Sequence, residues 1–139
     1  MPIDSRGRTA AQQNGLRYEA KVQKHLKSQI TGYIVSPGLV FVDLDITRVL
    51  LPDGLVFQPD GTAIIFEIKR QHMPEAWWQL RRLYEPVVRE LPFVNRTSCV
   101  EVVASFDPAM GFPEPVRVFT KVPDLLEAPT KDLKVLLWH

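Results

Sequence analysis

The chain has 139 residues, of which 45% are hydrophobic and 24% are charged, and its formal net charge is +1. That length is typical of one domain with its own core. The only cysteine, Cys99, excludes an intramolecular disulfide framework and fits a reducing compartment. No apolar run approaches the length of a membrane span, so we expect a soluble, cytoplasmic protein.

Positive charge is concentrated near the amino terminus. Residues 1–30 contain six Lys or Arg against two Asp or Glu, whereas residues 31–139 contain eleven against fourteen. A basic segment on a nearly neutral body can form an electrostatic footprint for the phosphates of nucleic acid. The same segment is equally consistent with an ordinary solvated helix face, and both interpretations stay open.

The first expected element is a helix from about Thr9 to Gln29. Apolar side chains recur there every four positions, as a helix with one buried stripe requires. The stripe consists of Tyr18, Val22, Leu26 and Ile30. Gly15 lies one turn before Glu19 near the same stripe, and we expect its missing side chain to let the helix approach a strand closely.

Glu19 falls close to the centre of this apolar stripe, so we expect its carboxylate to point toward the core. Basic side chains gather on the other side of the helix, and they are Arg17, Lys21, Lys24 and Lys27. Glu19 is either a site residue or a residue at the rim of the core that pairs with a nearby arginine.

A β-hairpin is expected around Pro59-Asp60-Gly61, between strand-like segments at residues 51–58 and 62–69. If the turn centres on Asp60, then Asp53 lies opposite Glu67, and Lys69 shares a face with Glu67 because strand side chains alternate. Asp60 itself is a turn residue. Extended chain would hold it about 23 Å from Glu67, at about 3.3 Å per residue, so the two cannot share an ion.

Both faces of this hairpin are otherwise apolar, as in strands covered on both sides. Two like charges at its end lose hydration and repel each other, and a divalent ion with oxygen ligands would compensate them. Asp53, Glu67 and Lys69 are therefore the leading site candidates. Asp43 and Asp45, on a preceding strand, are weaker alternatives as metal ligands.

A second helix is expected from Pro74 or Glu75 to about Leu91, with a kink or restart at Pro86. Strands are expected at about residues 98–106, 116–120 and 135–138, separated by prolines. Helix, strands, helix and strand in this order indicate an α/β sandwich around a mixed central sheet.

The remaining candidate residues are expected to have mainly structural roles. The histidines show no metal-ligand spacing with one another or with Cys99, and we expect surface or packing roles for His25, His72 and His139. His72 alone is near enough to Lys69 in sequence to touch a substrate. Cys99 is expected in the core of a strand.

Five elements occur in an order that resembles the PD-(D/E)xK nuclease superfamily. They are Glu19 on a first helix, Pro52-Asp53, then Glu67 and Lys69 on the next strand, and Gln79 on a following helix. The resemblance spans roughly residues 15–91. It implies a restriction-endonuclease-like three-layer sandwich in a single domain over residues 1–139, with a core at about 9–106 and a Pro-rich extension at 107–139.

The branch within that superfamily is suggested by two details. A RecB-like helix carries Gln-x-x-x-Tyr, whereas four residues separate Gln79 from Tyr84 here. Compactness and a glutamate on the first helix look more like the junction-resolving endonucleases of phages and archaea, the Holliday-junction-resolvase-like branch. That branch implies a bacterial, archaeal or phage-infected cell.

The resemblance also implies a metal-dependent phosphodiesterase. Asp53, Glu67 and the backbone carbonyl of Ile68 would bind Mg²⁺ (or Mn²⁺), and Glu19 would complete the set directly or through water. Lys69 would hold or deprotonate the attacking water.

Further roles follow from the same resemblance. Gln79 would orient Lys69 or the substrate. From the residues themselves, the basic face of the first helix and the aromatic and basic side chains of the second would contact DNA, through Arg17, Lys21, Lys24, Trp78 and Arg82. For Trp78, a contact with a partner chain is equally plausible. Symmetrical cutting of two strands would require a homodimer.

The leading functional hypothesis is therefore a Mg²⁺-dependent DNA endonuclease that acts on branched or structured DNA. One alternative is a non-catalytic assembly or nucleic-acid-binding component, for example of a phage particle, which keeps a nuclease-like fold and uses the Pro-rich tail and Trp138 for contacts. A metal-independent nucleic-acid binder is a third hypothesis, and it would show strongly salt-dependent affinity without turnover.

Overall fold

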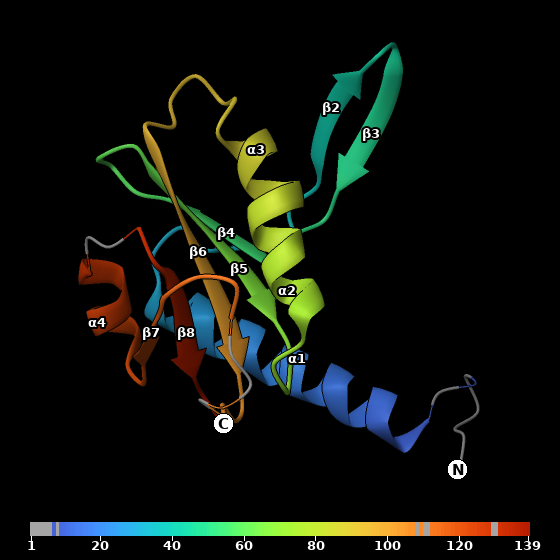
Figure 1. The fold of residues 1–139 in the computed structure, drawn as a ribbon, viewed down its shortest axis with the longest axis vertical. Helices are drawn as coiled ribbons and strands as arrows, with labels where there is room; N and C mark the ends of the chain where they lie inside the picture. Colours follow the sequence, from blue (N-terminus) through green and yellow to red (C-terminus); the bar gives the residue numbers. More distant parts are fainter. Residues whose placement is uncertain (1–6, 8, 108, 110–111, 129–130) are drawn as a thin grey trace.

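A mixed six-stranded β-sheet forms the centre of the computed structural model, which describes residues 7, 9–107, 109, 112–128 and 131–139 (Figure 1). In spatial order the strands are β1 (Ile34–Val35), β4 (Gly54–Phe57), β5 (Thr62–Ile68), β6 (Arg96–Val103), β8 (Leu133–Leu137) and β7 (Val116–Phe119). The pairs β1–β4 and β4–β5 are antiparallel, and the other three pairs are parallel.

Helices cover both faces of this sheet. The helical elements are α1 (Ala10–Gln29), α2 (Pro74–Trp78), the π-helical segment η1 (Gln79–Tyr84), α3 (Glu85–Val88) and α4 (Val122–Glu127). Residues of α1 and α4 pack on one face, and residues of α2, η1 and α3 pack on the other. The prediction of an α/β fold with a mixed central sheet flanked by helices is confirmed at this level.

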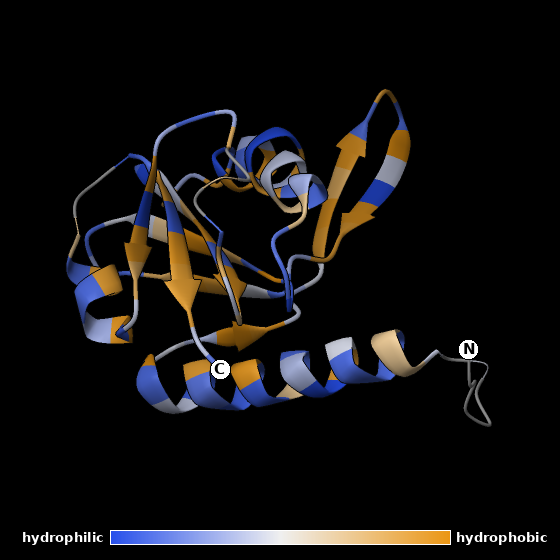
Figure 2. Ribbon diagram, turned by 60° about the horizontal axis from the view of Figure 1, so that its bottom comes forward, coloured by the Kyte–Doolittle hydropathy of each residue, from blue (hydrophilic) through white to orange (hydrophobic). Residues whose placement is uncertain are grey.

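Helix α1 begins where its sequence provides a cap. The Thr9 hydroxyl accepts a hydrogen bond from the Gln12 N–H at 3.2 Å, and the Gln12 side chain accepts one from the Thr9 N–H at 2.9 Å. This capping box satisfies two backbone donors that a helix start otherwise leaves free. The hydrophobic side of α1 faces the sheet in Figure 2, as the four-residue repeat predicted.

The β4–β5 hairpin has the predicted register. Leu55 lies opposite Ile65, and Gly54 lies opposite Phe66, so the pairing centres on Asp60. The Asp60 carboxylate accepts a hydrogen bond from the Thr62 N–H at 2.9 Å, and Gly61 takes the left-handed conformation at φ 88°. Asp60 is thus a turn residue, as expected.

Each face of the hairpin is buried in its own core. Val56, Ile64 and Phe66 pack against α1, whereas Leu55 and Ile65 pack under η1. A fully buried side chain of this size contributes about 1.5–3 kcal/mol to folding, so both faces hold the hairpin in register. Any charge at its end is attached to a rigid support.

The helical run between β5 and β6 contains a π-turn just before Pro86. The N–H of Glu85 donates to the carbonyl of Leu80, five residues earlier, instead of to the residue four earlier. Proline has no N–H, and its ring crowds the carbonyl four residues before it. The run widens before the proline and continues as α3 to Val88, which refines the predicted kink or restart.

The carboxyl-terminal segment belongs to the sheet and was expected outside the core. β8 lies between β6 and β7, and Leu133, Val135 and Leu136 are buried. The many prolines flank short strands, because proline is tolerated at strand ends and in connections. Trp138, to which only the assembly alternative assigned external contacts, stacks on His25 with ring centroids 4.8 Å apart. No helix among the described residues has the length and apolar character to cross a membrane.

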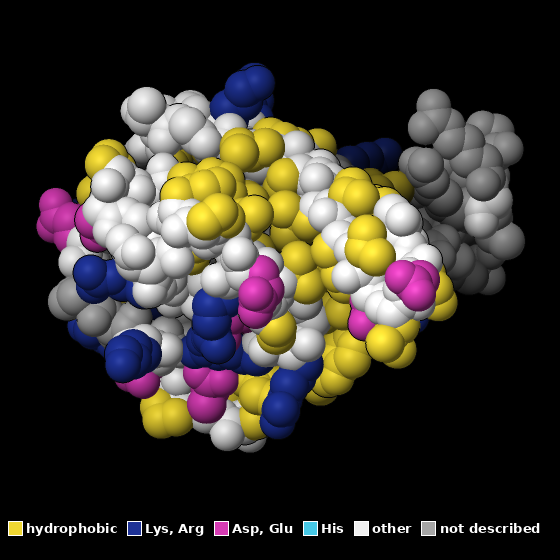
Figure 3. All heavy atoms as spheres, turned by 90° about the horizontal axis from the view of Figure 1, so that it is seen from above, with side chains coloured by type: hydrophobic (Ala, Val, Ile, Leu, Met, Phe, Trp, Pro, Cys, Tyr) yellow, Lys and Arg dark blue, Asp and Glu magenta, His cyan; other side chains and the backbone are white. Residues whose placement is uncertain are grey.

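A separate two-stranded hairpin, β2 (Leu39–Asp43) and β3 (Ile46–Leu50), projects from the sandwich (Figure 1). Asp43 and Asp45, the weaker alternatives as metal ligands, lie at its tip, where Asp43 approaches Arg48 at 3.7 Å, so the structure does not bring them to Asp53 and Glu67. A strand was correctly expected around Asp43 and Asp45, but β2 and β3 pair only with each other. Figure 3 looks onto this end of the molecule and shows hydrophobic patches separated by charges of both signs.

Candidate active site

Asp53 is fixed by hydrogen bonds to its backbone and to its side chain. Its carbonyl accepts from the Gln23 side chain at 2.7 Å and from the Ser36 N–H at 2.8 Å. One carboxylate oxygen accepts from the N–H of Ile68, at the end of β5, at 2.7 Å. Strand, loop and helix together hold this carboxylate beside the end of the hairpin.

Gly54 permits that arrangement. A side chain at Gly54 would collide with the ring of Tyr33, and the Tyr33 hydroxyl donates to the Gln23 side chain at 2.5 Å. The same Gln23 holds the Asp53 carbonyl. The glycine after Asp53 therefore allows the close approach that positions the carboxylate.

Glu67 is a buried carboxyl group whose ionisation the protein opposes. Its side chain lies on β5 with only 3% of the residue exposed. The pKa of Glu67 is raised to about 9, mainly by burial and then by the nearby Asp53 carboxylate, against a lowering by Lys69. One oxygen, Oε2, has no hydrogen-bond partner among the described residues. In this state the carboxyl group holds a proton at neutral pH.

Glu19, on α1, and Lys69, directly after β5, complete the cluster. Burial raises the pKa of Glu19, the charge of Asp53 raises it further, and the charge of Lys69 lowers it. Lys69 also lowers the pKa of Glu67, so the ammonium lies near both glutamates. The structure brings together Glu19, Asp53, Glu67 and Lys69 as the sequence predicted.

An open cleft of about 980 Å³ reaches this cluster. Glu19, Ile68 and Lys69 line it, together with Gly15. A side chain at Gly15 would meet nothing within 4 Å, so the expected close approach of α1 to a strand there is wrong. Gly15 instead widens the mouth of the cleft. Lys69 is half-buried and accessible from that side.

The π-turn changes the directions in which the side chains of Gln79 and Tyr84 point relative to each other. In a regular α-helix, residues five apart point about 140° away from each other. Hydrogen bonds five residues apart, as in η1, bring them toward one face. The Tyr84 hydroxyl donates to the carbonyl of Leu51 at 3.4 Å, and the pKa of this hydroxyl is raised by burial and then by the charge of the nearby Glu67. Gln79 keeps a buried, unpartnered Oε1, and no hydrogen bond joins it to Lys69 within the described residues.

A buried Glu101–His72 pair beside the cluster was missed from the sequence. Glu101 pairs in register with Glu67 on the next strand, so both side chains lie on one face. His72 Nδ1 lies 2.6 Å from the Glu101 carboxyl group, and Phe112 packs on the His72 ring with centroids 4.1 Å apart. Burial raises the pKa of Glu101, and the bond to His72 opposes that rise. A charged residue inside Cys-Val-Glu-Val-Val was the available signal, but the strand register was not.

Two of the expected nucleic-acid contacts lie beside the cleft. Arg17 and Lys21 line an adjoining hollow of about 470 Å³, which shares Arg70 and Gln71 with the cleft. The other three residues are exposed and line neither space, and they are Lys24, Trp78 and Arg82. Cys99 is a buried free thiol, as expected.

The cluster offers the oxygen donors that a hard cation requires, but too few of them to surround the ion without water. Its donors are oxygens, and Oε2 of Glu67 is buried without a partner. Yet in the described part of the chain no three side chains of His, Cys, Asp or Glu are arranged around a metal position. A site of two carboxylates and one backbone carbonyl falls below that number, and Mg²⁺ ordinarily keeps several waters beside one or two carboxylates. The residues fit such a partly hydrated ion.

Comparisons of this chain with protein-family models, with curated protein sequences and with solved structures found no match.

Proposed function

We propose that this protein is a metal-dependent DNA endonuclease of the PD-(D/E)xK type, with a restriction-endonuclease-like fold. The observation that carries the proposal is the cluster of Asp53, Glu67, Glu19 and Lys69 at one end of the β4–β5 hairpin, beside an open cleft. A buried carboxyl group with a pKa of about 9 beside a second carboxylate is costly for the fold alone. Such perturbed groups in a cleft are typical of functional sites.

Asp53, Glu67 and the Ile68 carbonyl would hold Mg²⁺, which supplies positive charge to a scissile phosphate and acidifies a water. Glu67 would release its proton on binding, because carboxylate ligands bind metal in the ionised form. The Ile68 N–H fixes the orientation of Asp53 beforehand. This preorganisation supports catalysis, because phosphodiester cleavage depends mainly on positioning and electrostatics.

Lys69 would stabilise negative charge that develops on the phosphate and would hold the attacking water. Glu19 faces Lys69 and Asp53 from α1, and it would accept a proton or a hydrogen bond from that water. Tyr84 and Gln79, which the π-turn brings toward one face, support a role of this helix in orienting Glu67 and the substrate.

The arrangement of cations supports DNA as the substrate. Arg70 lines both the cleft and the adjoining hollow, where Arg17 and Lys21 also lie. A duplex or branch point passing over α1 would meet these cations before it reached Lys69. Basic side chains that follow such a path bind the phosphate backbone without reading sequence.

The test is cleavage of supercoiled, linear and four-way-junction DNA with Mg²⁺ or Mn²⁺. We expect Lys69→Ala and Asp53→Asn each to lower the cleavage rate by about 10²-fold or more, as loss of one electrostatic group in a site does. Asp43→Asn, the same change at the tip of the projecting hairpin, is the matched control and should retain activity. Cleavage that persists in both site variants would rule out the assigned site.

Calorimetric titration with Mn²⁺ separates the nuclease from a non-catalytic component. We expect binding that Asp53→Asn weakens and Asp43→Asn does not. If the wild-type protein bound no Mn²⁺ and cut no DNA, the assembly or binding component would be the better description.

A further inference from the structure

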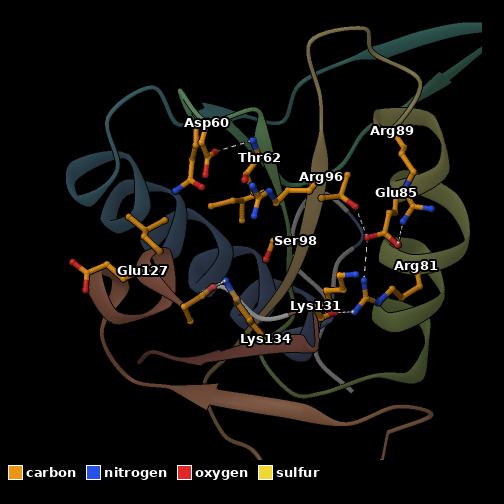
Figure 4. Close-up of a pocket in the computed structure, with 15 residues that line it drawn as sticks. Asp60, Thr62, Arg81, Glu85, Arg89, Arg96, Ser98, Glu127, Lys131 and Lys134 are labelled. Atoms are coloured by element: carbon orange, nitrogen blue, oxygen red, sulfur yellow. Dashed lines mark hydrogen bonds and ion pairs between the residues drawn. The ribbon is translucent and has the colours of Figure 1, made fainter.

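A second, more enclosed cavity lies at the other end of the parallel strands. It has a volume of about 380 Å³ and lies where β5 and β6 begin, next to α4 (Figure 4). Glu67 lies five residues farther along β5 than Thr62, which lines this cavity. The cavity and the cleft at Lys69 share no lining residue. It is therefore a separate site in the fold.

Lys134 is the least accessible cation in the lining of this cavity. It is 2% exposed, and its ammonium donates to the carbonyls of Leu125 at 3.0 Å and Ala128 at 2.8 Å. A lysine ammonium has three protons, so these two bonds leave one available. No carboxylate forms an ion pair with it among the described residues. Burying such a charge is costly unless an anion compensates it.

Ser98 places a second unsatisfied group in the same space. Its residue is 6% exposed, and its hydroxyl has no hydrogen-bond partner among the described residues. Ser98 and Lys134 project from the α4 side of the sheet, and Figure 4 shows Arg96 pointing into the same space. Strands β6 and β8 therefore present a hydroxyl, an ammonium and a guanidinium that converge on one cavity.

The remaining charges of the lining are largely occupied with one another. Glu85 pairs with Arg81 and Arg89, each at 3.0 Å, and Arg81 also pairs with Glu114. Asp60 accepts a hydrogen bond from the backbone of Thr62. Among the described ion pairs, none includes the three other cations of the lining, which are Arg96, Lys131 and Lys134. The hydrogen bond from Thr62 lowers the pKa of Asp60, and Arg96 lies near enough to lower it further, whereas the exposed Glu127 is the third carboxylate of the lining. Five cations therefore face three carboxylates, and the cavity carries an excess of positive charge.

We propose that this cavity binds a phosphate monoester of about the size of a mononucleotide, with the phosphate between Lys134, Ser98 and Arg96. A phosphate presents three terminal oxygens, and three donors from different positions match it better than they match the two oxygens of a carboxylate. A volume of about 380 Å³ lies within the range of small-molecule sites. It exceeds what a bare phosphate needs and leaves room for the sugar and base.

The test is calorimetric titration of the whole protein with deoxyadenosine monophosphate, inorganic phosphate and deoxyadenosine. We expect saturable binding of the monophosphate with a stoichiometry of one, and binding of the nucleoside at least tenfold weaker. Lys69→Ala, in the other cleft, should bind the monophosphate like the wild type, whether or not the protein is a nuclease. Absence of saturable monophosphate binding, or equal affinity for the nucleoside, would overturn the proposal.

Substitutions in the lining give the second arm of the test. Lys134→Met keeps most of the side-chain volume and removes the charge, and Arg96→Gln and Ser98→Ala probe the other two donors. We expect each of the first two to weaken monophosphate binding at least tenfold, whereas Lys121→Met, at an exposed lysine, should not. If Lys134→Met failed to fold, Arg96→Gln and Ser98→Ala would decide the question. Affinity unchanged in these variants would contradict the proposed site.

Discussion

Glu67 illustrates how burial of a single ionisable side chain can reduce the stability of a fold. Its pKa is raised to about 9, so in the folded protein it stays protonated at pH values where an unfolded chain would have lost the proton. Between the two pKa values the folded state binds more protons than the unfolded state. The free energy of unfolding must then fall as the pH rises through this window.

We therefore predict that Glu67→Gln flattens the pH dependence of stability between about pH 5 and pH 9 in the absence of metal, because glutamine stays neutral throughout. Below about pH 4, both proteins should respond to pH alike at this site. The measurement is thermal or denaturant unfolding over this pH range in the presence of a chelator. Glu75→Gln, at an exposed glutamate, is the control and should keep the wild-type slope. An unchanged slope in Glu67→Gln would show that the buried carboxyl group is already ionised.

Gly54 is a second residue on which the site depends. We predict that Gly54→Ala destabilises the fold by about 1–3 kcal/mol, as overpacking does, because the new methyl group collides with Tyr33. Gly15→Ala is the matched control, because its methyl group meets open space on a helix and should stabilise by about 0.5–1 kcal/mol. Denaturant unfolding of both variants gives the comparison. If Gly54→Ala were as stable as the wild type, Tyr33 would not be held against the backbone as described.

At the scale of elements, the π-turn is the feature that a regular helix would not reproduce. It adds one residue between Gln79 and Tyr84 and comes just before Pro86. Removing the extra residue should return the run to an α-helix, with Gln79 and Tyr84 four apart and still on one face.

We predict that deletion of Arg82 combined with Pro86→Ala leaves stability within about 1 kcal/mol of wild type, because Arg82 is exposed and both flanking turns keep their orientation. Deletion of Arg82 alone should cost about 3 kcal/mol more, since proline would then lie inside a regular helix. Deletion of Lys24 from α1 is the control. It turns the following residues by about 100° and should remove Leu26 from the core, with a loss of at least about 2–5 kcal/mol. If the deletion of Arg82 combined with Pro86→Ala cost as much stability as the deletion of Lys24, the π-turn account would be contradicted.

At the scale of the whole molecule, the sequence predicted those features of the fold that depend on the spacing of residues along one helix or one hairpin. The stripe of α1 and the symmetry of the β4–β5 hairpin both follow from residue spacing, and they were enough to bring Asp53, Glu67 and Glu19 together. What could not be predicted depends on contacts distant in sequence. Glu101 joins the cluster only because β6 pairs with β5 in a parallel register. Strands were also expected near residues 116–120 and 135–138, but the position of β8 between β6 and β7 depends on pairing that leaves no local signal.

The distribution of cations around the cleft leads to the last prediction. A protein that neutralises phosphates releases counterions, so the logarithm of its DNA affinity falls linearly with the logarithm of salt concentration, by about 0.9 per phosphate contact. Arg17 and Lys21 line the hollow beside the cleft, whereas Lys27 and Lys121 are exposed elsewhere. We predict that Arg17→Gln with Lys21→Gln reduces the slope by about 2 for a duplex in the presence of a chelator. The pair Lys27→Gln and Lys121→Gln makes the same change in net charge and should leave the slope nearly unchanged. Fluorescence anisotropy at several salt concentrations measures both. If both double variants reduced the salt-dependence slope by the same amount, net charge alone would govern DNA binding. A specific path of DNA over α1 toward Lys69 would then not be needed to explain the affinity.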